Sequence, residues 1–365
     1  MIHEITYTKE WIEKKSNEYK RGKKKADPIL IEKIIKALHL LEELAKSELA
    51  FIFKGGTSLL LLLNQMHRFS IDIDIIIEKS ENKVDIDKIL AKMVEGSVVF
   101  THFEENVRQG DKEIPKAHYK FFYKSLLDGE ENYILLDTLF EQSHYAEVIR
   151  KKVDCSFIEY KDPEVKVLMP SVDCILGDKL TAYAPNTTGI PYGKNKELEI
   201  IKQLFDVGNL FDEMRKVDIV SKTFKQMAAQ ELVYRGKDHE LTYEDVLDDI
   251  FETSRIISER GRIEKEVFNQ LQTGIKRIKG YIFSKNYIVE SAVNSASKAA
   301  YLSLLIKYGI TDVERFNPKL DLREYVIEHP DFRKLKTIMK FDPEAYFYWY
   351  KSIELLENRE KSNTK

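Results

Sequence analysis

Cysteine is scarce in this chain, which has two, Cys155 and Cys174, among 365 residues. Two isolated cysteines are too few for a disulfide framework or a cysteine-based zinc site. The eight histidines show no spacing typical of metal ligands either. The sequence therefore favours a cytoplasmic protein with reduced thiols.

Long hydrophobic runs are also missing. No stretch approaches the roughly 20 apolar residues that are needed to span a bilayer, so we expect no membrane partner. The first residues, MIHEITYTKEW, lack the pattern of a secretory signal.

Net charge is small, formally −3, so the sequence excludes neither nucleic acid nor small substrates as partners. With 43% hydrophobic and 33% charged residues the composition is that of an ordinary globular protein. A length of 365 residues is enough for two domains with a core each.

The most informative stretch is 54–77, which reads KGGTSLLLLLNQMHRFSIDIDIII. It places Gly55 and Gly56 after an apolar run and sets Asp72 and Asp74 among isoleucines. Side chains two apart in a strand point to the same face. The two carboxylates are therefore expected side by side, while the isoleucines face the core.

Neighbouring carboxylates repel each other unless a cation lies between them. Two Mg²⁺ ions about 3.5 to 4 Å apart can clamp the attacking and leaving oxygens of a phosphoryl substitution, and one Asp can bridge both ions. Asp72 and Asp74 are therefore candidate catalytic residues and metal ligands.

The residues before the acidic strand are suited to binding a nucleotide phosphate. Gly55 and Gly56 allow the backbone to approach an anion closely. Thr57 and Ser58 are predicted to cap the following helix and to donate hydrogen bonds to phosphate oxygens. Arg68 either pairs with phosphate or braces the acidic strand.

The order of these features resembles the first motif of the polymerase-β-like nucleotidyltransferase superfamily. More specifically, GGTSL followed by RFSIDID is similar to the AbiEii family, the toxins of type IV toxin–antitoxin and abortive-infection systems. The resemblance implies an α+β fold: a nucleotidyltransferase domain whose mixed sheet is flanked by helices, followed by a helical C-terminal domain.

Two alternating runs, 117–123 and 133–139, are separated by Asp128 and Gly129 and predict an antiparallel hairpin. The second run holds Asp137, a lone acid on a mostly apolar face. Asp137 is either a surface or capping aspartate, or the third carboxylate that the resemblance places on a neighbouring strand, where it would be catalytic and bind metal.

From about residue 171 the chain is predominantly helical by pattern. Segments 172–184 and 202–211 resemble a second conserved block of the AbiEii family. The resemblance implies that Lys179 is catalytic and binds the nucleotide phosphates. It also suggests Asp206 for the nucleotide site, although the loop between the segments sets Asp206 farther along the chain than expected.

We expect three regions: a basic N-terminal arm at 1–27, the nucleotidyltransferase domain at 28–165, and a helical domain at 166–365 that completes the active site and binds the acceptor. The arm contains five cations within 20–25, which are either solvated or contact phosphates. Asp27 and Pro28 predict the start of a helix.

The C-terminal region carries basic clusters and an aromatic run at 346–350. Basic groups beside aromatics suit a single-stranded RNA end, whereas an aromatic stripe on a helix is more often core. The clusters consist of Lys276, Arg277, Lys279, Arg333, Lys334, Lys336 and Lys340.

The resulting hypothesis is transfer of a nucleoside monophosphate from an NTP to a hydroxyl, with two Mg²⁺ ions as cofactors and Mn²⁺ as an alternative. The resemblance implies that the acceptor is the 3′ end of tRNA, that translation is blocked, and that an antitoxin is encoded nearby. Two alternatives stay open: nucleotidylation of a protein or small molecule, and a catalytically silent nucleotide-binding module.

Overall fold

A computed structural model describes residues 1–20, 25–63, 68–78, 83–106, 115–283 and 286–363. The chain divides into two compact units. Unit 1 comprises Met1–Ser171 and Tyr281–Asn286, and unit 2 comprises Val172–Gly280 and Tyr287–Lys365. This division follows residue 171, whereas the sequence predicts a boundary after residue 165.

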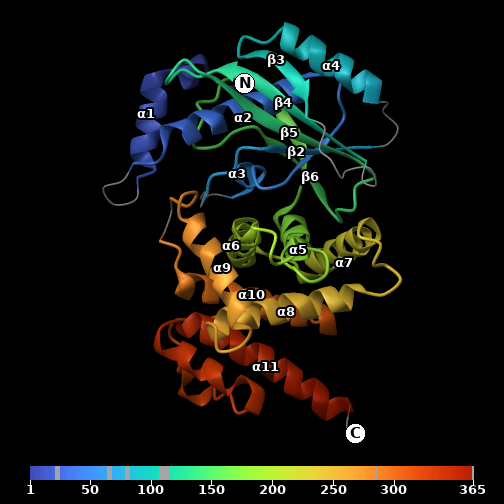
Figure 1. Ribbon diagram of the computed structural model, residues 1–365, viewed down its shortest axis with the longest axis vertical. Coiled ribbons are helices and arrows are strands. Elements are labelled where there is room, and N and C mark those ends of the chain that lie inside the picture. Colours follow the sequence, from blue (N-terminus) through green and yellow to red (C-terminus); the bar gives the residue numbers. More distant parts are fainter. Residues whose placement is uncertain (21–24, 64–67, 79–82, 107–114, 284–285, 364–365) are drawn as a thin grey trace. The chain divides into compact units, whose positions relative to one another are not determined.

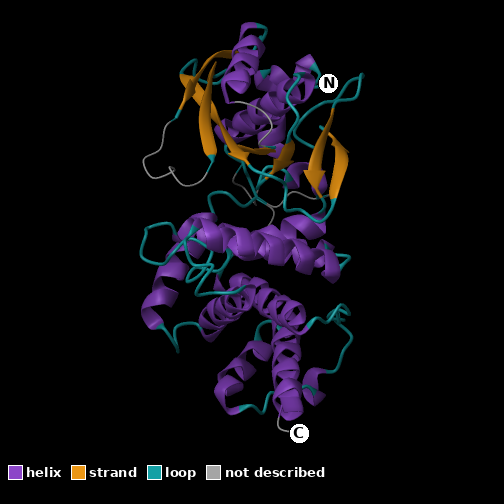
Figure 2. Ribbon diagram, turned by 90° about the vertical axis from the view of Figure 1, so that its right-hand side faces the viewer, coloured by secondary structure: helices purple, strands orange, loops and turns teal. Residues whose placement is uncertain are grey.

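Unit 1 is built on a mixed seven-stranded sheet in the order β3-β4-β5-β2-β1-β7-β6. The β2–β5 and β1–β7 pairs are parallel, and the other neighbours are antiparallel (Figures 1 and 2). The predicted fold class, a mixed sheet with helices and a helical C-terminal part, is confirmed. The strands are β1 (Ile52–Lys54), β2 (Ile73–Ile77), β3 (Phe100–Glu105), β4 (Lys116–Lys124), β5 (Glu131–Phe140), β6 (Val148–Lys152) and β7 (Lys166–Pro170).

Helix α2 (Pro28–Lys46) packs under the sheet and begins as predicted. The Asp27 side chain accepts a hydrogen bond from the backbone N–H of Ile29, and Pro28 occupies the first turn. The side chains of Ile34 and Leu38 are fully buried in the core of unit 1. The other helices of this unit are η1 (Glu4–Tyr7), α1 (Lys9–Glu18), α3 (Leu59–Leu62) and α4 (Lys83–Glu95).

Most of the expected N-terminal arm is folded onto unit 1. Trp11 on α1 is buried and donates from Nε1 to the carbonyl of Phe157 at 2.9 Å. The N–H of Ile2 donates to the buried carboxylate of Glu42 on α2 at 2.6 Å. The lysine-rich run predicts a basic arm that is either solvated or contacts phosphates. In the structure, however, residues 1–19 bury both apolar and polar side chains. Residues 21–24 of that run lie outside the described part.

The predicted hairpin is β4–β5, whose nine residue pairs run from Lys116↔Leu139 to Lys124↔Glu131. Gly129 lies in its turn with φ +78°, a conformation that favours glycine. The buried side chains of Ile134 and Leu136 alternate with those of the more exposed face, to which Asp137 belongs. The hairpin therefore fixes the position and direction of Asp137.

Unit 2 is helical, as predicted. Its aromatic run lies on α11, where Tyr346, Phe347, Tyr348 and Trp349 are 0 to 3% exposed. These rings are core residues, so they cannot form a stacking platform for RNA bases. The elements are α5 (Val172–Ala182), α6 (Glu197–Glu213), α7 (Val217–Tyr234), α8 (Tyr243–Glu259), α9 (Lys265–Ile278), α10 (Val289–Tyr308), η2 (Leu322–Glu324), η3 (Pro330–Lys340) and α11 (Pro343–Asn363).

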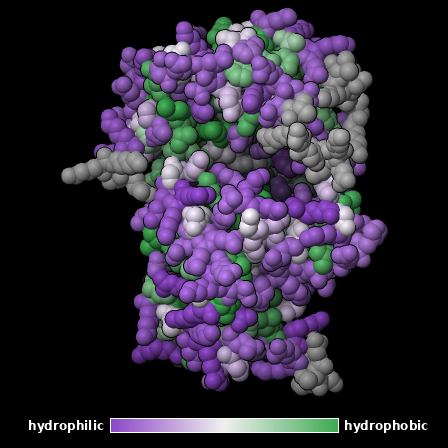
Figure 3. Space-filling model, viewed as in Figure 1, coloured by the Kyte–Doolittle hydropathy of each residue, from purple (hydrophilic) through white to green (hydrophobic). Residues whose placement is uncertain are grey.

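The surface is largely hydrophilic on the face seen in Figure 3, with hydrophobic side chains in small separate groups. Large exposed hydrophobics such as Val98, Val233 and Val326 lie far apart in the sequence. Within the described ranges, no helix has the length and apolar character required to cross a bilayer.

Candidate active site

A row of four polar residues crosses the middle of the unit 1 sheet. Lys54 on β1 pairs with Asp74 on β2, Asp74 pairs with Asp137 on β5, and Asp137 pairs with His118 on β4. Residues paired across neighbouring strands project to the same face of a sheet. The sheet therefore brings one lysine, two carboxylates and one histidine together by backbone register alone.

The two carboxylates of the row come from parallel neighbours, β2 and β5. Asp74 is partly buried, and the side chain of Asp137 is 28% exposed. On β2 the flanking Ile73 and Ile75 are buried, as the alternation predicted. Asp72 lies one residue before β2 and is also partly buried. Neighbouring like charges on one face create a local demand for a cation.

Gly55 lies directly against the carboxylate of Asp74. Its φ is +79°, and a Cβ at this position would lie 1.9 Å from Oδ2 of Asp74. A side chain at residue 55 would therefore be strained by the backbone and would displace the carboxylate. This close approach explains the first glycine of the motif better than a tight turn alone does.

The hydroxyls of Thr57 and Ser58 are used inside the motif itself. Thr57 Oγ1 donates to the carbonyl of Asp72 at 2.6 Å, and Ser58 Oγ donates to the carbonyl of Gly55 at 2.7 Å. Ser58 precedes α3 but makes no capping hydrogen bond, so the predicted side-chain cap is wrong. Both side chains are fully buried and hold the turn against the acidic strand.

Gly56 and Arg68 lie next to each other in the same motif. A Cβ on Gly56 would lie 2.7 Å from Oγ of Ser70 and 3.0 Å from Nη2 of Arg68. Arg68 is 9% exposed, its Nη1 donates to the carbonyl of Phe69 at 3.1 Å, and its backbone bridges to Ile282. These contacts favour the bracing role that was one of the two alternatives for this arginine.

Lys179 and Asp206 form an ion pair inside unit 2. Lys179 lies on α5 and Asp206 on α6, and Nζ is 3.2 Å from Oδ2. Both side chains are deeply buried, 10% and 2% exposed. The extra loop length between the two segments does not separate them. The structure therefore gathers the predicted residues into two sets, one in each unit.

His118 is the member of the row that the sequence did not single out. Its Nδ1 lies 2.6 Å from Oδ1 of Asp137, and its side chain is 8% exposed. The available signal was the alternation along 116–124, which puts His118 on the face opposite to the buried Ala117 and Tyr119. That signal becomes informative only with the register of the hairpin, because the pairing identifies Asp137 as its partner.

The donor set suits a hard cation, because carboxylate oxygens are the ligands that Mg²⁺ and Mn²⁺ prefer. Asp74 and Asp137 are neighbours in register, and Asp72 lies two residues from Asp74. Among the described residues, however, no three His, Cys, Asp or Glu side chains are grouped closely enough to hold a metal ion together. Asp74 and Asp137 therefore suit a divalent cation as a pair of ligands. A site in which Asp72 is the third carboxylate ligand stays a prediction.

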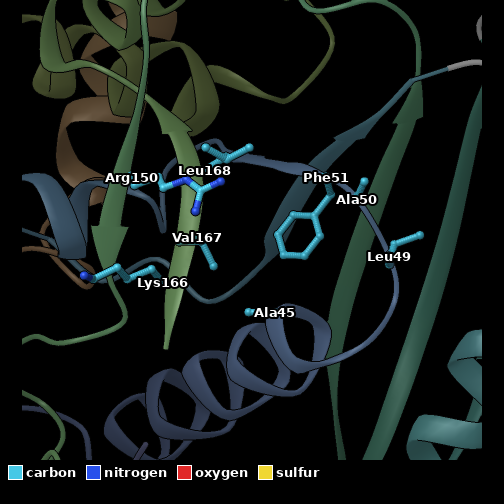
Figure 4. A pocket seen from close by; sticks show the side chains of 8 residues that line it. All are labelled: Ala45, Leu49, Ala50, Phe51, Arg150, Lys166, Val167 and Leu168. Carbon is cyan, nitrogen blue, oxygen red and sulfur yellow. The ribbon is translucent and has the colours of Figure 1, made fainter. Parts of the chain in front are cut away.

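A cavity of about 180 Å³ lies elsewhere in unit 1, where β7 and the residues before β1 diverge (Figure 4). Its cationic lining residues are Arg150 and Lys166, and Phe51 and Val167 provide apolar walls. None of the residues in the polar row lines it. The cavity is therefore separate from the candidate active site.

Comparison with known families identifies the class of protein. The profile described as "Nucleotidyl transferase AbiEii toxin, Type IV TA system" matches residues 39–277. Because the match spans more than half of the chain, the protein belongs to the AbiEii family. The resemblance seen in the 54–77 motif is thereby confirmed, and the chain is a nucleotidyltransferase of a toxin–antitoxin family.

Solved structures offer distant likenesses. JHP933 from Helicobacter pylori has 14% identity and a TM-score of 0.43, covering 76% of this chain and 92% of its own. An antigenic nucleotidyltransferase-like protein from Paracoccidioides brasiliensis has 12% identity and a TM-score of 0.36, covering 57% of this chain and 93% of its own. Both are too distant to inform the chemistry. No curated protein matches the chain.

Proposed function

We propose that this protein transfers a nucleoside monophosphate from an NTP to the 3′-terminal hydroxyl of tRNA and releases pyrophosphate. The observation that carries the proposal is the placement of Asp74 and Asp137 in register on adjacent strands, with Gly55 against the Asp74 carboxylate. In-line phosphoryl transfer needs positioned charge more than a covalent nucleophile. A pair of carboxylates fixed by backbone register supplies that positioning.

Asp72, Asp74 and Asp137 would hold Mg²⁺, which supplies positive charge to the phosphate oxygens and lowers the pKa of the attacking hydroxyl. Asp137 is the proposed acceptor of the proton from that hydroxyl. Gly55 keeps the approach to Asp74 open, because its missing side chain leaves the carboxylate in place. Thr57, through its bond to the Asp72 carbonyl, keeps the turn rigid.

Lys179 is proposed to neutralise charge that builds on the leaving pyrophosphate. Its ion pair with Asp206 fixes the ammonium group in one place on α5. Such preorganisation is useful because a long lysine side chain otherwise loses much rotamer freedom when it binds.

An RNA acceptor agrees with a basic ridge on unit 2, formed by the exposed side chains of Arg333, Lys334, Lys336 and Lys340 on η3. The buried Phe332, Leu335 and Ile338 alternate with them and anchor the ridge. Exposed cations on a surface are suited to contacts with RNA phosphates. Nucleotide addition at the 3′ end would block aminoacylation, which accounts for toxicity and for the need for an antitoxin.

The acceptor can be tested directly. Purified protein, Mg²⁺ and each α-labelled NTP are incubated in parallel with total tRNA, total protein and a metabolite extract. We expect label at the 3′ end of tRNA and no label after periodate oxidation of that end. Asp74→Asn serves as the inactive control for background enzymes.

Label confined to the protein pool or the metabolite pool would overturn the tRNA assignment and favour nucleotidylation of those acceptors. Absence of label in all pools, with NTP binding intact, would favour a silent nucleotide-binding module. With tRNA, binding should also weaken as salt rises, with a log–log slope of about −0.7 per single-strand phosphate contacted.

A further inference from the structure

His118 and Asp137 form a close side-chain contact at the end of the polar row. Nδ1 of His118 lies 2.6 Å from Oδ1 of Asp137, which is short for a hydrogen bond from nitrogen to oxygen. An ionised carboxylate can only accept, so Nδ1 carries the hydrogen and donates it. With an ionised Asp137, the contact therefore assigns a hydrogen to Nδ1 of His118.

Burial differs between the two partners. The His118 side chain is 8% exposed, whereas Asp137 is 28% exposed. The histidine thus lies inside unit 1 and donates outward to a carboxylate that is more open to solvent. An exposed ion pair has little effect on conformation, but a buried donor with a fixed ring holds its acceptor in place.

Backbone pairing fixes the geometry on both sides. His118 and Asp137 are direct partners in the antiparallel β4–β5 ladder. On the far side of β4, the N–H of Asn106 donates to the carbonyl of His118 at 2.6 Å. The histidine backbone is therefore held between segments on both sides, and Nδ1 of its ring contacts the carboxylate of Asp137.

We propose that His118 is a positioning residue, which orients the Asp137 carboxylate towards Asp74 and towards the ion that the two aspartates would share. The inference rests on the proposed function, in which Asp137 ligates that ion and accepts a proton. With Oδ1 engaged by His118, rotation of the carboxylate about its Cβ–Cγ bond is restricted. Residues that orient ligating carboxylates in this way typically affect metal affinity or activity by about 10- to 100-fold.

The positioning role of His118 requires a hydrogen-bond donor at the place of Nδ1. Two amide substitutions distinguish a donor at Nδ1 from a donor at Nε2. In His118→Asn the side-chain amide nitrogen takes roughly the place of Nδ1, whereas in His118→Gln it takes roughly the place of Nε2. His118→Leu fills the space without any donor. His102→Leu, on the neighbouring β3, is the matched control, because His102 is exposed and stacks on Phe122.

The expected result is a graded series. His118→Asn should keep kcat/KM and Mn²⁺ affinity within about threefold of wild type, while His118→Leu and His118→Gln should lose about 10- to 100-fold in both. Mn²⁺ affinity is measured by electron paramagnetic resonance on the protein without nucleotide. All variants, with His102→Leu, should show cooperative thermal unfolding.

A spectroscopic readout tests the contact without any ion or substrate. Two-bond ¹H–¹⁵N correlation spectra of the metal-free protein should show hydrogen on Nδ1 of His118, and Asp137→Ala should change that pattern. This measurement stands even if the protein proves not to transfer nucleotides, so failure of the positioning role and failure of the proposed function can be told apart.

Two outcomes would overturn the proposal. One is a neutral His118 ring that carries its hydrogen on Nε2 in the wild-type protein. The other is equal loss in His118→Asn, His118→Gln and His118→Leu together with lowered unfolding temperatures, because a role in stability alone does not depend on the place of the donor.

Discussion

The two units place their charged residues together in different ways. In unit 1, Asp74 and Asp137 carry like charges and are neighbours because strand register makes them so. In unit 2, Lys179 and Asp206 carry opposite charges and meet as side chains between packed helices. Neighbouring like charges oppose folding slightly and favour binding of a cation. In a buried ion pair each charge compensates the other, so removal of one partner destabilises the fold. Substitutions should therefore separate chemistry from stability in unit 1 but couple the two in unit 2.

The largest effect is expected at the carboxylates of unit 1. Asp72→Ala and Asp74→Ala should each lower nucleotide transfer by at least ~10³-fold, about 4 kcal/mol of activation free energy. Single-turnover kinetics with labelled NTP measure this change. Near-normal turnover in either variant would contradict the assignment of the two aspartates as ligands of the catalytic metal ions.

Asp74→Asn separates charge from shape. It removes the charge and keeps the shape of the side chain, so transfer should be lost while the free energy of unfolding changes less than it does for the buried pair of unit 2. Chemical denaturation of the two proteins side by side gives the comparison. A clear loss of stability would place Asp74 in the same class as the buried pair of unit 2.

The unit 2 pair should show both effects. Lys179→Ala is expected to slow transfer by about 10²-fold, as removal of a group that stabilises charge in the transition state does. Each single variant, Lys179→Ala and Asp206→Ala, should also lose about 3 kcal/mol of unfolding free energy, because it leaves a buried charge without its partner. Affinity for tRNA without nucleotide should remain unchanged, as filter binding can show.

A double-mutant cycle sharpens this expectation. If Asp206 acts by holding Lys179, the losses of the two single variants should not add in Lys179→Ala/Asp206→Ala, for stability and for transfer alike. Additive losses in transfer would instead give Asp206 a separate role in the site.

Gly55→Ala should produce a smaller effect that falls mainly on chemistry. The new Cβ must displace the Asp74 carboxylate, so we expect at least a ~10-fold loss of transfer, together with about 1 kcal/mol for the left-handed backbone. Gly129→Ala is the matched control, since it has φ +78° but has no atom nearer than 4.0 Å to its Cβ. Gly129→Ala should lose about as much unfolding free energy as Gly55→Ala and should keep its activity. Equal losses of activity in the two variants would show that the contact between residue 55 and the Asp74 carboxylate is not the cause.

The smallest effect is a pH dependence in the core of unit 1. Burial lowers the pKa of His39 to about 3, with Lys36 and Lys46 adding in the same direction. Its Nδ1 contacts the Tyr7 hydroxyl at 2.7 Å, and within the described chain its buried Nε2 has no hydrogen-bond partner.

The sign follows from the proton that His39 binds only when the chain is unfolded. Between about pH 6.5 and pH 3 the unfolded state holds that proton and the folded state does not, so stability falls as the pH falls. The slope is about 1.4 kcal/mol per pH unit at most for one group. Denaturation from pH 7 to pH 4 should show a shallower loss in His39→Phe than in wild type, and parallel curves would contradict the assignment.

Local sequence signals predicted much of the fold. The alternation around Asp74, the cap at Asp27 and the turn at Gly129 each depend on neighbours within a few residues, and the structure has the strand, the helix and the hairpin there. Lys179 and Asp206 came from the second block of family resemblance, and the structure places them together as an ion pair, while their role at the nucleotide stays a prediction.

What the sequence could not provide was long-range pairing. His118 becomes relevant only when the β4–β5 register sets it beside Asp137. The sequence predicts that the Thr57 hydroxyl donates a hydrogen bond to phosphate. In the folded turn it donates to the carbonyl of Asp72. Likewise, the packing of Trp11 depends on Phe157, which is 146 residues away in the chain.

The most direct test of the account is whether Asp74 and Asp137 bind one ion together. Mn²⁺ binding is measured by electron paramagnetic resonance with a non-hydrolysable NTP for wild type, Asp74→Asn, Asp137→Asn and the double variant, with Asp128→Asn in the exposed β4–β5 turn as control. Each single variant is expected to lose most of the affinity, the double variant to lose little more, and the control to bind as wild type does. Wild-type Mn²⁺ affinity in the double variant would contradict this expectation.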